Sequence, residues 1–258
     1  MAKAKDIPEG LTEAEFKLVR ALRDRKHRRA EGAFLVQGRK LVEEVLQAGW
    51  PVRFVVATAE AARVTGIPAR LLRTAPAHRM ERLGTFGSGN EWIAVVDLPG
   101  PAVDGPLEAG ELVLALDGVA DPGNLGTIIR LADWFGMRRL WCSPGTVDPF
   151  NPKVVQASMG SLLRVAVVEV PLPERLARAR REGATVHAAD LTGTSVFEAT
   201  LVRPAVLVLG SESHGLSAAV RAGADILLRV PGRGGAESLN VAMAATALCM
   251  EFERRRQP

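Results

Sequence analysis

Short apolar runs alternate along the chain with segments whose apolar residues recur at helical spacing. In the first half, residues 34–38 and 53–58 form strand-like apolar runs, and residues 40–49 between them repeat apolar positions at helical intervals. Residues 11–30 also have helical character, and residues 92–99 form a last strand-like run. This pattern predicts a small α/β unit of about a hundred residues.

The second half alternates in the same way, with strands that are apolar along their whole length. We expect strands at residues 111–119, 139–143, 185–191, 205–212 and 225–231, and helices at residues 124–136, 151–165, 175–183, 214–223 and 238–256. Strands that are apolar on both faces and alternate with helices predict an α/β fold with a mostly parallel sheet, covered by helices on both sides.

A segment rich in proline and glycine separates the two halves. Residues 97–110 hold three prolines and three glycines and offer almost nothing to bury, which is typical of a linker. We therefore predict two domains, residues 1–105 and residues 106–258.

The composition indicates a globular protein without a membrane segment. Of 258 residues, 47% are hydrophobic and 24% are charged, and no apolar run is long enough to cross a bilayer. The N-terminal residues lack the apolar stretch of a signal peptide, so we expect a cytoplasmic protein. Cys142 and Cys249 lie in apolar surroundings, and the four histidines are scattered. Neither a disulfide framework nor a metal site is predicted.

Positive charge is concentrated near the N-terminus. The formal net charge is +4. The basic cluster comprises Arg20, Arg23, Arg25, Lys26, Arg28 and Arg29. Arginine binds phosphate through a planar fork of donors and stacks on bases, so nucleic acid is one sensible partner. An excess of arginine can equally reflect genome composition or heat adaptation, and charge alone leaves both interpretations open.

Polar residues follow three of the predicted strands, at the end of a parallel sheet where ligands bind. After the first, Asn124 and Gly126 lead into a helix that carries Arg130. The spacing matches neither GxGxxG nor GxxxxGK[ST], which argues against a dinucleotide site or a P-loop. Asn124 alone could cap the helix. Arg130 stands in an apolar stretch, and a buried arginine there would need a partner or a ligand.

The other two strand ends are richer in glycine. Gly210 is followed by Ser211 and Glu212, which a helix cap would explain, although Gly210 would also let a ligand approach the backbone. The last strand ends at Pro231, and a glycine-rich loop then runs through residues 237–240, Glu-Ser-Leu-Asn, into an apolar helix. A cap accounts for Ser238 or Asn240 but not for the whole segment.

Together these strand ends form three ordered motifs. They are NxGxxxR at residues 124–130, LGSExxGLS at residues 209–217 and PxxGxxESLNVA at residues 231–242. In type, order and spacing, residues 111–256 resemble the SpoU (TrmH-like) family of S-adenosylmethionine-dependent RNA ribose 2′-O-methyltransferases. The first half is similar to the family's substrate-binding domain, which is related to ribosomal-protein L30e-like RNA binders. The chain departs from the family at Gln37 (often Glu), Ser213 (often Gly) and Gly232 (often Met).

The resemblance implies a fold, a cofactor and partners. The fold would be a C-terminal SPOUT domain with a deep trefoil knot, preceded by a small L30e-like α/β domain. S-adenosylmethionine would bind in the knotted cleft, and the catalytic domain would form a homodimer whose active sites combine groups from both subunits. The substrate would be structured RNA. An L30e-like domain favours ribosomal over transfer RNA, by analogy of fold alone.

The resemblance also assigns residues to roles. The catalytic set is Asn124, Arg130, Glu212, Ser238 and Asn240. The cofactor set is Leu209, Gly210, Val230, Pro231, Gly232, Ser238 and Leu239. Leu239 would lie beside the adenine, and Gly232, Gly234 and Gly235 would allow tight turns and close approach to the cofactor. The six basic residues at positions 20–29 would bind RNA.

Two classes of alternative remain. One is a non-catalytic RNA-binding or assembly protein with the same fold, which the complete polar set at the motifs disfavours. The other is a nucleotide-binding dehydrogenase or kinase, which the absent glycine fingerprints disfavour.

Overall fold

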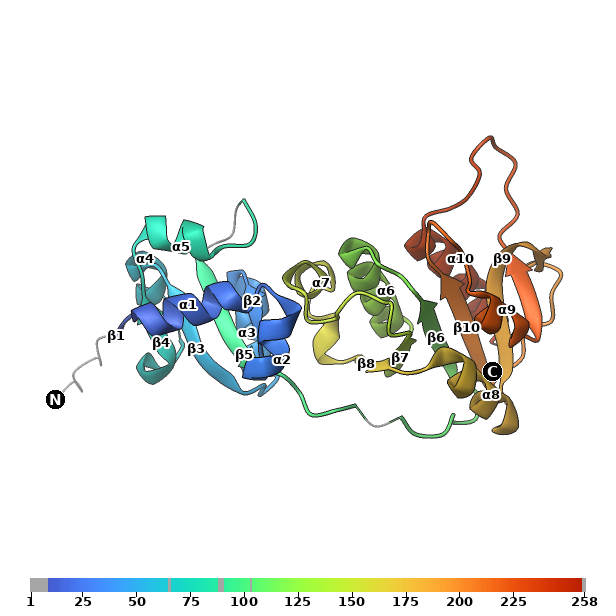
Figure 1. Cartoon of the computed structure of the whole chain (residues 1–258), viewed down its shortest axis with the longest axis horizontal. Helices are drawn as coiled ribbons and strands as arrows, with labels where there is room; N and C mark the ends of the chain where they lie inside the picture. The colour runs from blue at the N-terminus through green and yellow to red at the C-terminus, as the bar shows by residue number, and fades with distance from the viewer. Residues whose placement is uncertain (1–8, 65, 88–90, 103, 257–258) are drawn as a thin grey trace. The chain divides into compact units, whose positions relative to one another are not determined.

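The structure is a computed structural model in which residues 9–64, 66–87, 91–102 and 104–256 are described (Figure 1). The expectation of no signal peptide rests partly on residues 1–8, which lie outside the described residues. Among the described residues, no helix combines the length and apolar character needed to cross a membrane.

The chain forms two compact units. The first comprises residues 1–100 and 150–163, and the second comprises residues 101–149 and 164–258. This division differs from two continuous domains because residues 150–163 group with the first unit.

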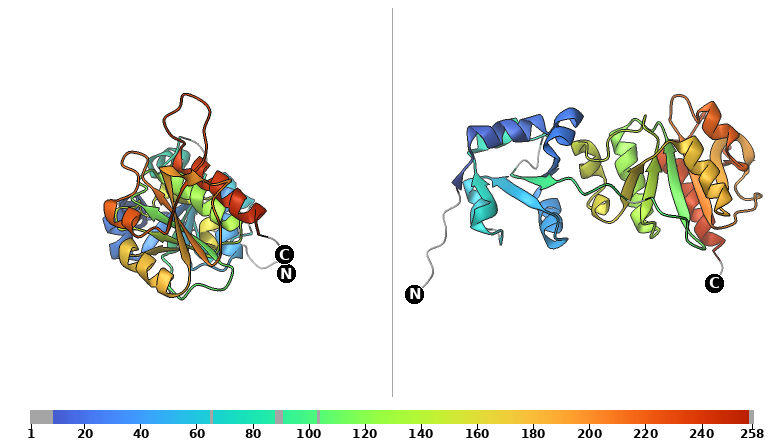
Figure 2. Two further views of the ribbon diagram at one scale, coloured as in Figure 1. Left: turned by 90° about the vertical axis from the view of Figure 1, so that its right-hand side faces the viewer. Right: turned by 60° about the horizontal axis from the view of Figure 1, so that its bottom comes forward.

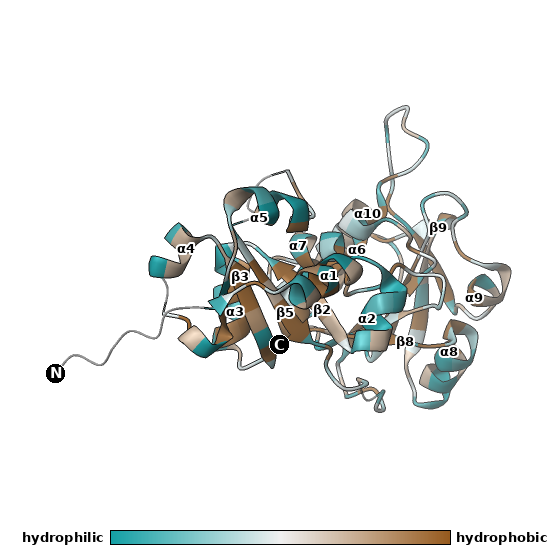
Figure 3. Ribbon diagram, turned by 60° about the vertical axis from the view of Figure 1, so that its left-hand side comes forward, coloured by the Kyte–Doolittle hydropathy of each residue, from teal (hydrophilic) through white to brown (hydrophobic). Residues whose placement is uncertain are grey.

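The first unit contains a mixed five-stranded sheet. Its strands, in spatial order, are β1 (Glu9–Gly10), β4 (Leu72–Thr74), β3 (Val52–Ala57), β5 (Trp92–Asp97) and β2 (Ala33–Gln37). Strand β5 runs antiparallel to both β2 and β3, while β1, β4 and β3 are parallel. Its α-helices are α1 (Glu13–Ala21), α2 (Arg25–Glu31), α3 (Arg39–Gln47), α4 (Ala59–Arg63), α5 (Ala77–Leu83) and α7 (Pro152–Ala157). Figure 3 shows the apolar strands β3 and β5 and the hydrophilic helix α2.

Helix α7 is shorter than the helix expected at residues 151–165. It ends at Ala157, and a separate 3-10 turn covers Ser161–Leu163. Between them, Met159 has φ 49° and Gly160 has φ 86°. Two left-handed residues in succession cannot continue a right-handed helix. Helix α7 packs on β2.

The second unit contains the predicted parallel sheet. Its six strands, in spatial order, are β11 (Ile226–Arg229), β9 (Thr185–Ser195), β10 (Ala205–Gly210), β6 (Leu112–Asp117), β7 (Arg139–Cys142) and β8 (Ala166–Glu169). Every pairing is parallel. The two central strands, β10 and β6, are each buried over their first five residues. The prediction of a mostly parallel α/β sheet is therefore confirmed, while the deep knot stays a prediction.

Helices pack in two pairs around this sheet. Helix α6 (Pro122–Trp134) contacts α10 (Val241–Arg254), and α8 (Leu172–Arg181) contacts α9 (Ala218–Ala222). The left view of Figure 2 shows α6 (green) and α10 (red) on one side of the sheet and α8 (yellow) and α9 (orange) on the other. Both faces of the strands are therefore covered, which explains why alternating positions show no polar face.

The predicted linker has no helix or strand among its described residues from 98 to 110, but its second part is fixed to the second unit. Arg139 donates to the carbonyl oxygens of Gly105 at 2.8 Å and Pro106 at 2.6 Å. The buried Arg175 lies 2.6 Å from a carboxylate oxygen of Asp104. These contacts fix residues 104–106 to the second unit.

Candidate active site

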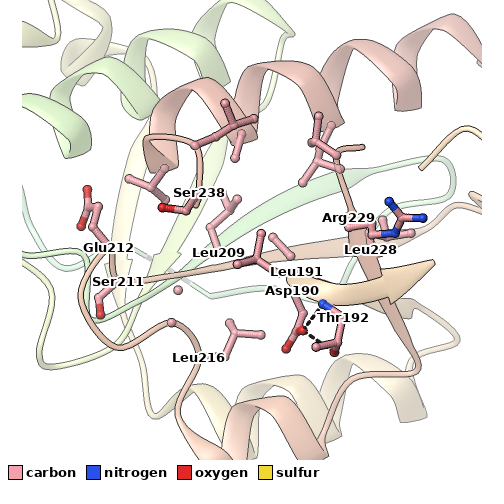
Figure 4. A pocket seen from close by; sticks show the side chains of 18 of the residues that line it. Asp190, Leu191, Thr192, Leu209, Ser211, Glu212, Leu216, Leu228, Arg229 and Ser238 are labelled. Carbon is pink, nitrogen blue, oxygen red and sulfur yellow. Dashed lines mark hydrogen bonds between the residues drawn. The ribbon is translucent and has the colours of Figure 1, made fainter. Parts of the chain in front are cut away.

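A cavity of about 600 Å³ lies in the second unit where strands β9, β10 and β11 end (Figure 4). Leu209, Leu216, Leu228 and Leu248 contribute apolar surface to it. Polar side chains from the three strand ends and from the loop before α10 complete its lining. Its size and mixed lining are those of a site for a small organic molecule.

The loop after β10 forms one wall of this pocket and is held by its own backbone. Ser211 and Gly215 exchange two backbone hydrogen bonds, at 3.1 and 2.9 Å. A Cβ atom placed on Gly210 would overlap the backbone of Gly215 and Leu216. Glycine is therefore required at position 210 by the packing of the chain itself, a cause that the sequence interpretation did not include.

The loop of residues 230–240 forms another wall and is held much less tightly. Figures 1 and 2 show it extending away from the sheet between β11 and α10. Gly232, Gly234 and Gly235 do not take left-handed φ angles, and a Cβ on each would meet only open space. The chain's own packing gives no reason for glycine at these positions, so their role in close approach to the cofactor stays a prediction.

Only some of the predicted cofactor residues line the pocket. Leu209, Gly210, Val230, Ser238 and Leu239 line the pocket, whereas Pro231 and Gly232 are not among the residues that line it. Leu239 is 45% exposed, so its side chain has surface available for a ligand.

Three of the predicted catalytic residues form one hydrogen-bonded chain. The side-chain amide of Asn240 donates to the side-chain oxygen of Asn124 at 2.9 Å. The amide of Asn124 in turn donates to a carboxylate oxygen of Glu212, which lines the pocket. These hydrogen bonds connect the starts of α6 and α10 with the loop after β10, although the three residues lie far apart in the sequence.

Helix capping accounts for part of this arrangement. Asp121, not Asn124, caps α6 by accepting a hydrogen bond from the backbone N–H of Asn124 at 2.8 Å. Asn240 caps α10, since its side-chain oxygen accepts from the N–H groups of Ala242 and Met243. Asn240 therefore has two roles, because its oxygen starts a helix while its nitrogen joins the polar chain.

Arg130 lies on the outer face of α6, contrary to the idea that it is buried. Its neighbours Ile128 and Ile129 are buried, but Arg130 is exposed, as is Thr127 one turn earlier. Arg130 makes no hydrogen bond or ion pair with any residue that the structure describes. Its guanidinium is therefore available to a group from outside this chain.

A carboxylate that the sequence interpretation missed lies at the end of the apolar part of β9. Asp190 lines the pocket and accepts hydrogen bonds from Arg221 at 2.8 Å and from the Thr192 hydroxyl at 2.6 Å. These bonds, above all that from Arg221, lower the pKa of Asp190 to about 2. The signal was present in the sequence, because Asp190 directly follows an apolar strand, as Glu212 nearly does.

The six basic residues of the first unit do not form one surface. Arg28 is only 2% exposed and donates to the carbonyl oxygens of Leu22 and Arg23, so its assignment to RNA binding is corrected. Arg23 donates to the carbonyls of Arg82 and Gly84, both at 2.8 Å. Arg20, Lys26 and Arg29 are exposed members of the cluster.

Each half of the chain matches a known protein family. Residues 111–250 match the SpoU rRNA Methylase family, and residues 13–82 match the MRM3-like substrate binding domain.

Individual relatives cover nearly the whole chain. The 23S rRNA (uridine(2479)-2′-O)-methyltransferase of Streptomyces viridochromogenes is 33% identical, with 94% of this chain and 90% of the relative aligned. The 23S rRNA (guanosine(2553)-2′-O)-methyltransferase RlmP of Bacillus subtilis is also 33% identical, over 88% of this chain and 91% of the relative.

Solved structures agree with the fold. A putative RNA methyltransferase of the TrmH family from Porphyromonas gingivalis superimposes with a TM-score of 0.84 and 43% identity, covering 95% of this chain and 99% of that one. The SpoU methyltransferase AviRb from S. viridochromogenes, solved in complex with AdoMet, has a TM-score of 0.84 and 32% identity, with coverages of 95% and 98%.

Proposed function

Because the chain belongs to the SpoU rRNA Methylase family, we propose that it transfers a methyl group from S-adenosylmethionine to a ribose 2′-hydroxyl of ribosomal RNA. The observation that carries this proposal is the hydrogen-bonded chain from Asn240 through Asn124 to Glu212 at the pocket. The two named relatives modify 23S rRNA, which favours ribosomal over transfer RNA.

The size and the lining of the pocket suit this methyl donor. Its leucines offer apolar surface for the adenine, and Leu239 extends that surface from the loop before α10. The carboxylates of Asp190 and Glu212 suit a ligand that carries positive charge and hydroxyl groups. When bound, S-adenosylmethionine supplies a methyl group on a positively charged sulfur.

We propose catalytic roles for these residues that their contacts support. Asn124 fixes the Glu212 carboxylate, and Figure 4 shows Ser238 near the Glu212 end of the pocket. Arg130 has no partner among the described residues, so it can orient the ribose hydroxyl and neutralise the developing alkoxide or the adjacent phosphate. A guanidinium keeps its proton at neutral pH, so Arg130 is not the base. The proton leaves to that phosphate or to water.

The decisive experiment measures methyl transfer to ribosomal and transfer RNA separately. Unmodified RNA from each class is incubated with labelled S-adenosylmethionine and the protein, Arg130→Ala, Arg130→Lys or the control Arg181→Ala, which changes an exposed arginine on α8. We expect label in alkali-resistant dinucleotides of ribosomal RNA, lost with Arg130→Ala, strongly reduced with Arg130→Lys and retained with the control. Near-full activity of Arg130→Lys would contradict the need for a planar fork.

Other outcomes separate the alternatives. Label in transfer RNA alone would replace the proposed substrate. A protein that binds both the donor and ribosomal RNA, including assembly intermediates, yet transfers no label would be a non-catalytic RNA binder.

We also propose that the active form is a homodimer that meets through α6 and α10. Trp134 on α6 is 82% exposed, and Met243 and Met250 on α10 are 63% and 55% exposed. These side chains belong to two helices that contact each other, and the exposed Arg130 shares a stripe of α6 with Trp134. In a monomer these large apolar side chains would be exposed to solvent. Their exposure therefore supports a surface for self-association.

Light scattering tests this surface. Met250→Glu is expected to shift the protein from dimer to monomer, because a carboxylate would be buried without a partner. The control Val64→Glu changes an apolar residue of similar exposure, 63%, in the first unit and should leave the mass unchanged. A dimer that survives Met250→Glu and Trp134→Glu together would contradict the proposal.

For the first unit we propose RNA binding, with residues 1–105 as the substrate domain and residues 106–258 as the methyltransferase domain. The match to the MRM3-like substrate binding domain supports this division. The exposed cations Arg20, Lys26 and Arg29 supply the charge. A substrate in the ribosome would place the protein in the cytoplasm.

A further inference from the structure

The charged groups of the pocket are unevenly partnered. Three carboxylates line it, those of Asp190, Glu212 and Glu237, against the two guanidinium groups of Arg221 and Arg229. These carboxylate and guanidinium groups together carry one net negative charge. S-adenosylmethionine carries a carboxylate, an ammonium and a sulfonium, and hence one net positive charge. The net charges of the pocket and of the donor are therefore complementary. The carboxylate of the donor still needs a cationic side chain in a lining that is rich in carboxylates.

Arg221 is already neutralised within the chain. Its Nε atom donates to Asp190 at 2.8 Å, and another of its nitrogens donates to the Thr192 hydroxyl at 3.1 Å. Because the pKa of Asp190 is lowered to about 2, this carboxylate stays charged at neutral pH and keeps Arg221 engaged.

Arg229, unlike Arg221, is not neutralised by a described residue of the chain. Its side chain is exposed and makes no hydrogen bond or ion pair with any described residue. Its backbone is fixed, since the Arg229 carbonyl accepts from the N–H of Val196 at 2.9 Å in the edge strand β11. Figure 4 shows Arg229 at the other end of the pocket from Glu212, with Leu209 between them. A fixed backbone therefore presents a guanidinium that has no partner among the described residues at one end of the cavity.

We propose that Arg229 binds the α-carboxylate of S-adenosylmethionine and so anchors the amino-acid arm of the donor. This inference rests on the proposed function, since it names a specific contact within that pocket. Arginine suits the task because its planar fork donates two parallel hydrogen bonds to a carboxylate.

A cycle of two ligands and two variants tests the contact. Calorimetry measures the Kd of S-adenosylmethionine and of decarboxylated S-adenosylmethionine for the full-length protein, Arg229→Gln and Arg233→Gln. The control Arg233→Gln removes an equal charge from the neighbouring loop, outside the pocket lining. We expect Arg229→Gln to weaken S-adenosylmethionine about tenfold and to leave the decarboxylated ligand within about twofold. The control should change neither ligand by more than about twofold.

Each result has a separate meaning. An equal loss for both ligands in Arg229→Gln, or an equal loss in the control, would overturn the contact, because the effect would not depend on the carboxylate. Unchanged binding in Arg229→Gln would also overturn it. If the unaltered protein bound neither ligand, the proposed function itself would fail. A correctly folded variant is verified by its urea unfolding midpoint.

Discussion

The two loops that border the pocket are both rich in glycine, yet they are built in opposite ways. The loop after β10 closes on itself through paired backbone hydrogen bonds between Ser211 and Gly215, and Gly210 fits against the backbone of that turn. The loop of residues 230–240 projects from the unit, and a Cβ on any of its glycines would meet open space. The first loop is shaped by the chain alone, whereas the second leaves its glycines free for a ligand or a partner.

The contrast teaches that a glycine motif has two distinct physical meanings. At Gly210 a side chain would collide with atoms of the same chain, so the residue is needed for folding. At Gly234 a side chain would collide with nothing described, so any requirement for glycine must come from something bound. Substitution at the two positions separates these meanings.

The largest effect is expected for Gly210→Ala. The added Cβ overlaps the backbone of Gly215 and Leu216, and backbone atoms cannot move aside as a flexible side chain can. We expect the free energy of unfolding to fall by about 3 kcal/mol or more. Urea denaturation followed by circular dichroism measures it. An unchanged unfolding midpoint would show that the first loop is as open as the second.

Asn124→Ala acts at the point where the two loops are joined. It removes the amide that bridges Glu212 of the first loop and Asn240 at the end of the second. We expect kcat for methyl transfer to fall about a hundredfold, because the carboxylate loses its orientation. The free energy of unfolding should fall by only about 1 kcal/mol.

Asn124→Asp keeps the size of the side chain but faces Glu212 with a second negative charge. It should be at least as inactive as Asn124→Ala. Activity close to that of the unaltered protein in either variant would mean that the bridge between the loops is not needed for catalysis.

Asp190→Asn weakens a third wall of the pocket by removing its ion pair with Arg221. The pKa of Asp190 is lowered in the folded state from 3.8 to about 2, so the carboxylate stabilises the fold above about pH 4. We expect the variant to be about 1–2 kcal/mol less stable at pH 7, a difference that shrinks as the pH falls from about 4 to about 2.

Urea midpoints of the two proteins across this pH range provide the measurement for Asp190→Asn. Glu198→Gln, which changes an exposed carboxylate, serves as control. A stability difference that stays constant down to pH 2 would contradict the assigned role of the ion pair.

The smallest effect on folding is expected for Gly234→Ala. Since the Cβ meets open space and φ is not left-handed, the free energy of unfolding should change by less than about 0.5 kcal/mol. The Kd of S-adenosylmethionine then reports on the ligand alone. A loss of affinity with unchanged stability would sharpen the contrast with Gly210, and a loss of stability would remove it.

Much of the fold could be predicted from local sequence. The buried strands β6 and β10 are uninterrupted apolar runs, and a parallel sheet with two covered faces follows from them. The polar chain of Asn124, Glu212 and Asn240 could be predicted because each residue stands at a strand end or a helix start in a motif of fixed order. Asp190 was open to the same reasoning.

What could not be predicted depends on direction and on distant backbone. Arg130 follows two buried isoleucines, but each residue of a helix turns by about 100°, and this turn places it on the outer face. Arg28 belongs to a run of charges that gives no sign of burial, and the carbonyls that satisfy it are set by the turn before α2. The requirement at Gly210 arises only after the loop has folded back on the strand.

Asn240 fixes the direction of the hydrogen bonds that run from it through Asn124 to Glu212. Its oxygen is committed to the first N–H groups of α10, so its nitrogen must point to Asn124. Asn124 must then present its own oxygen to Asn240, and its nitrogen donates to a carboxylate oxygen of Glu212. Neither amide can be turned end for end without breaking a bond at both ends. The start of one helix thereby dictates the polarity of every link, and the site has a single arrangement before any substrate arrives.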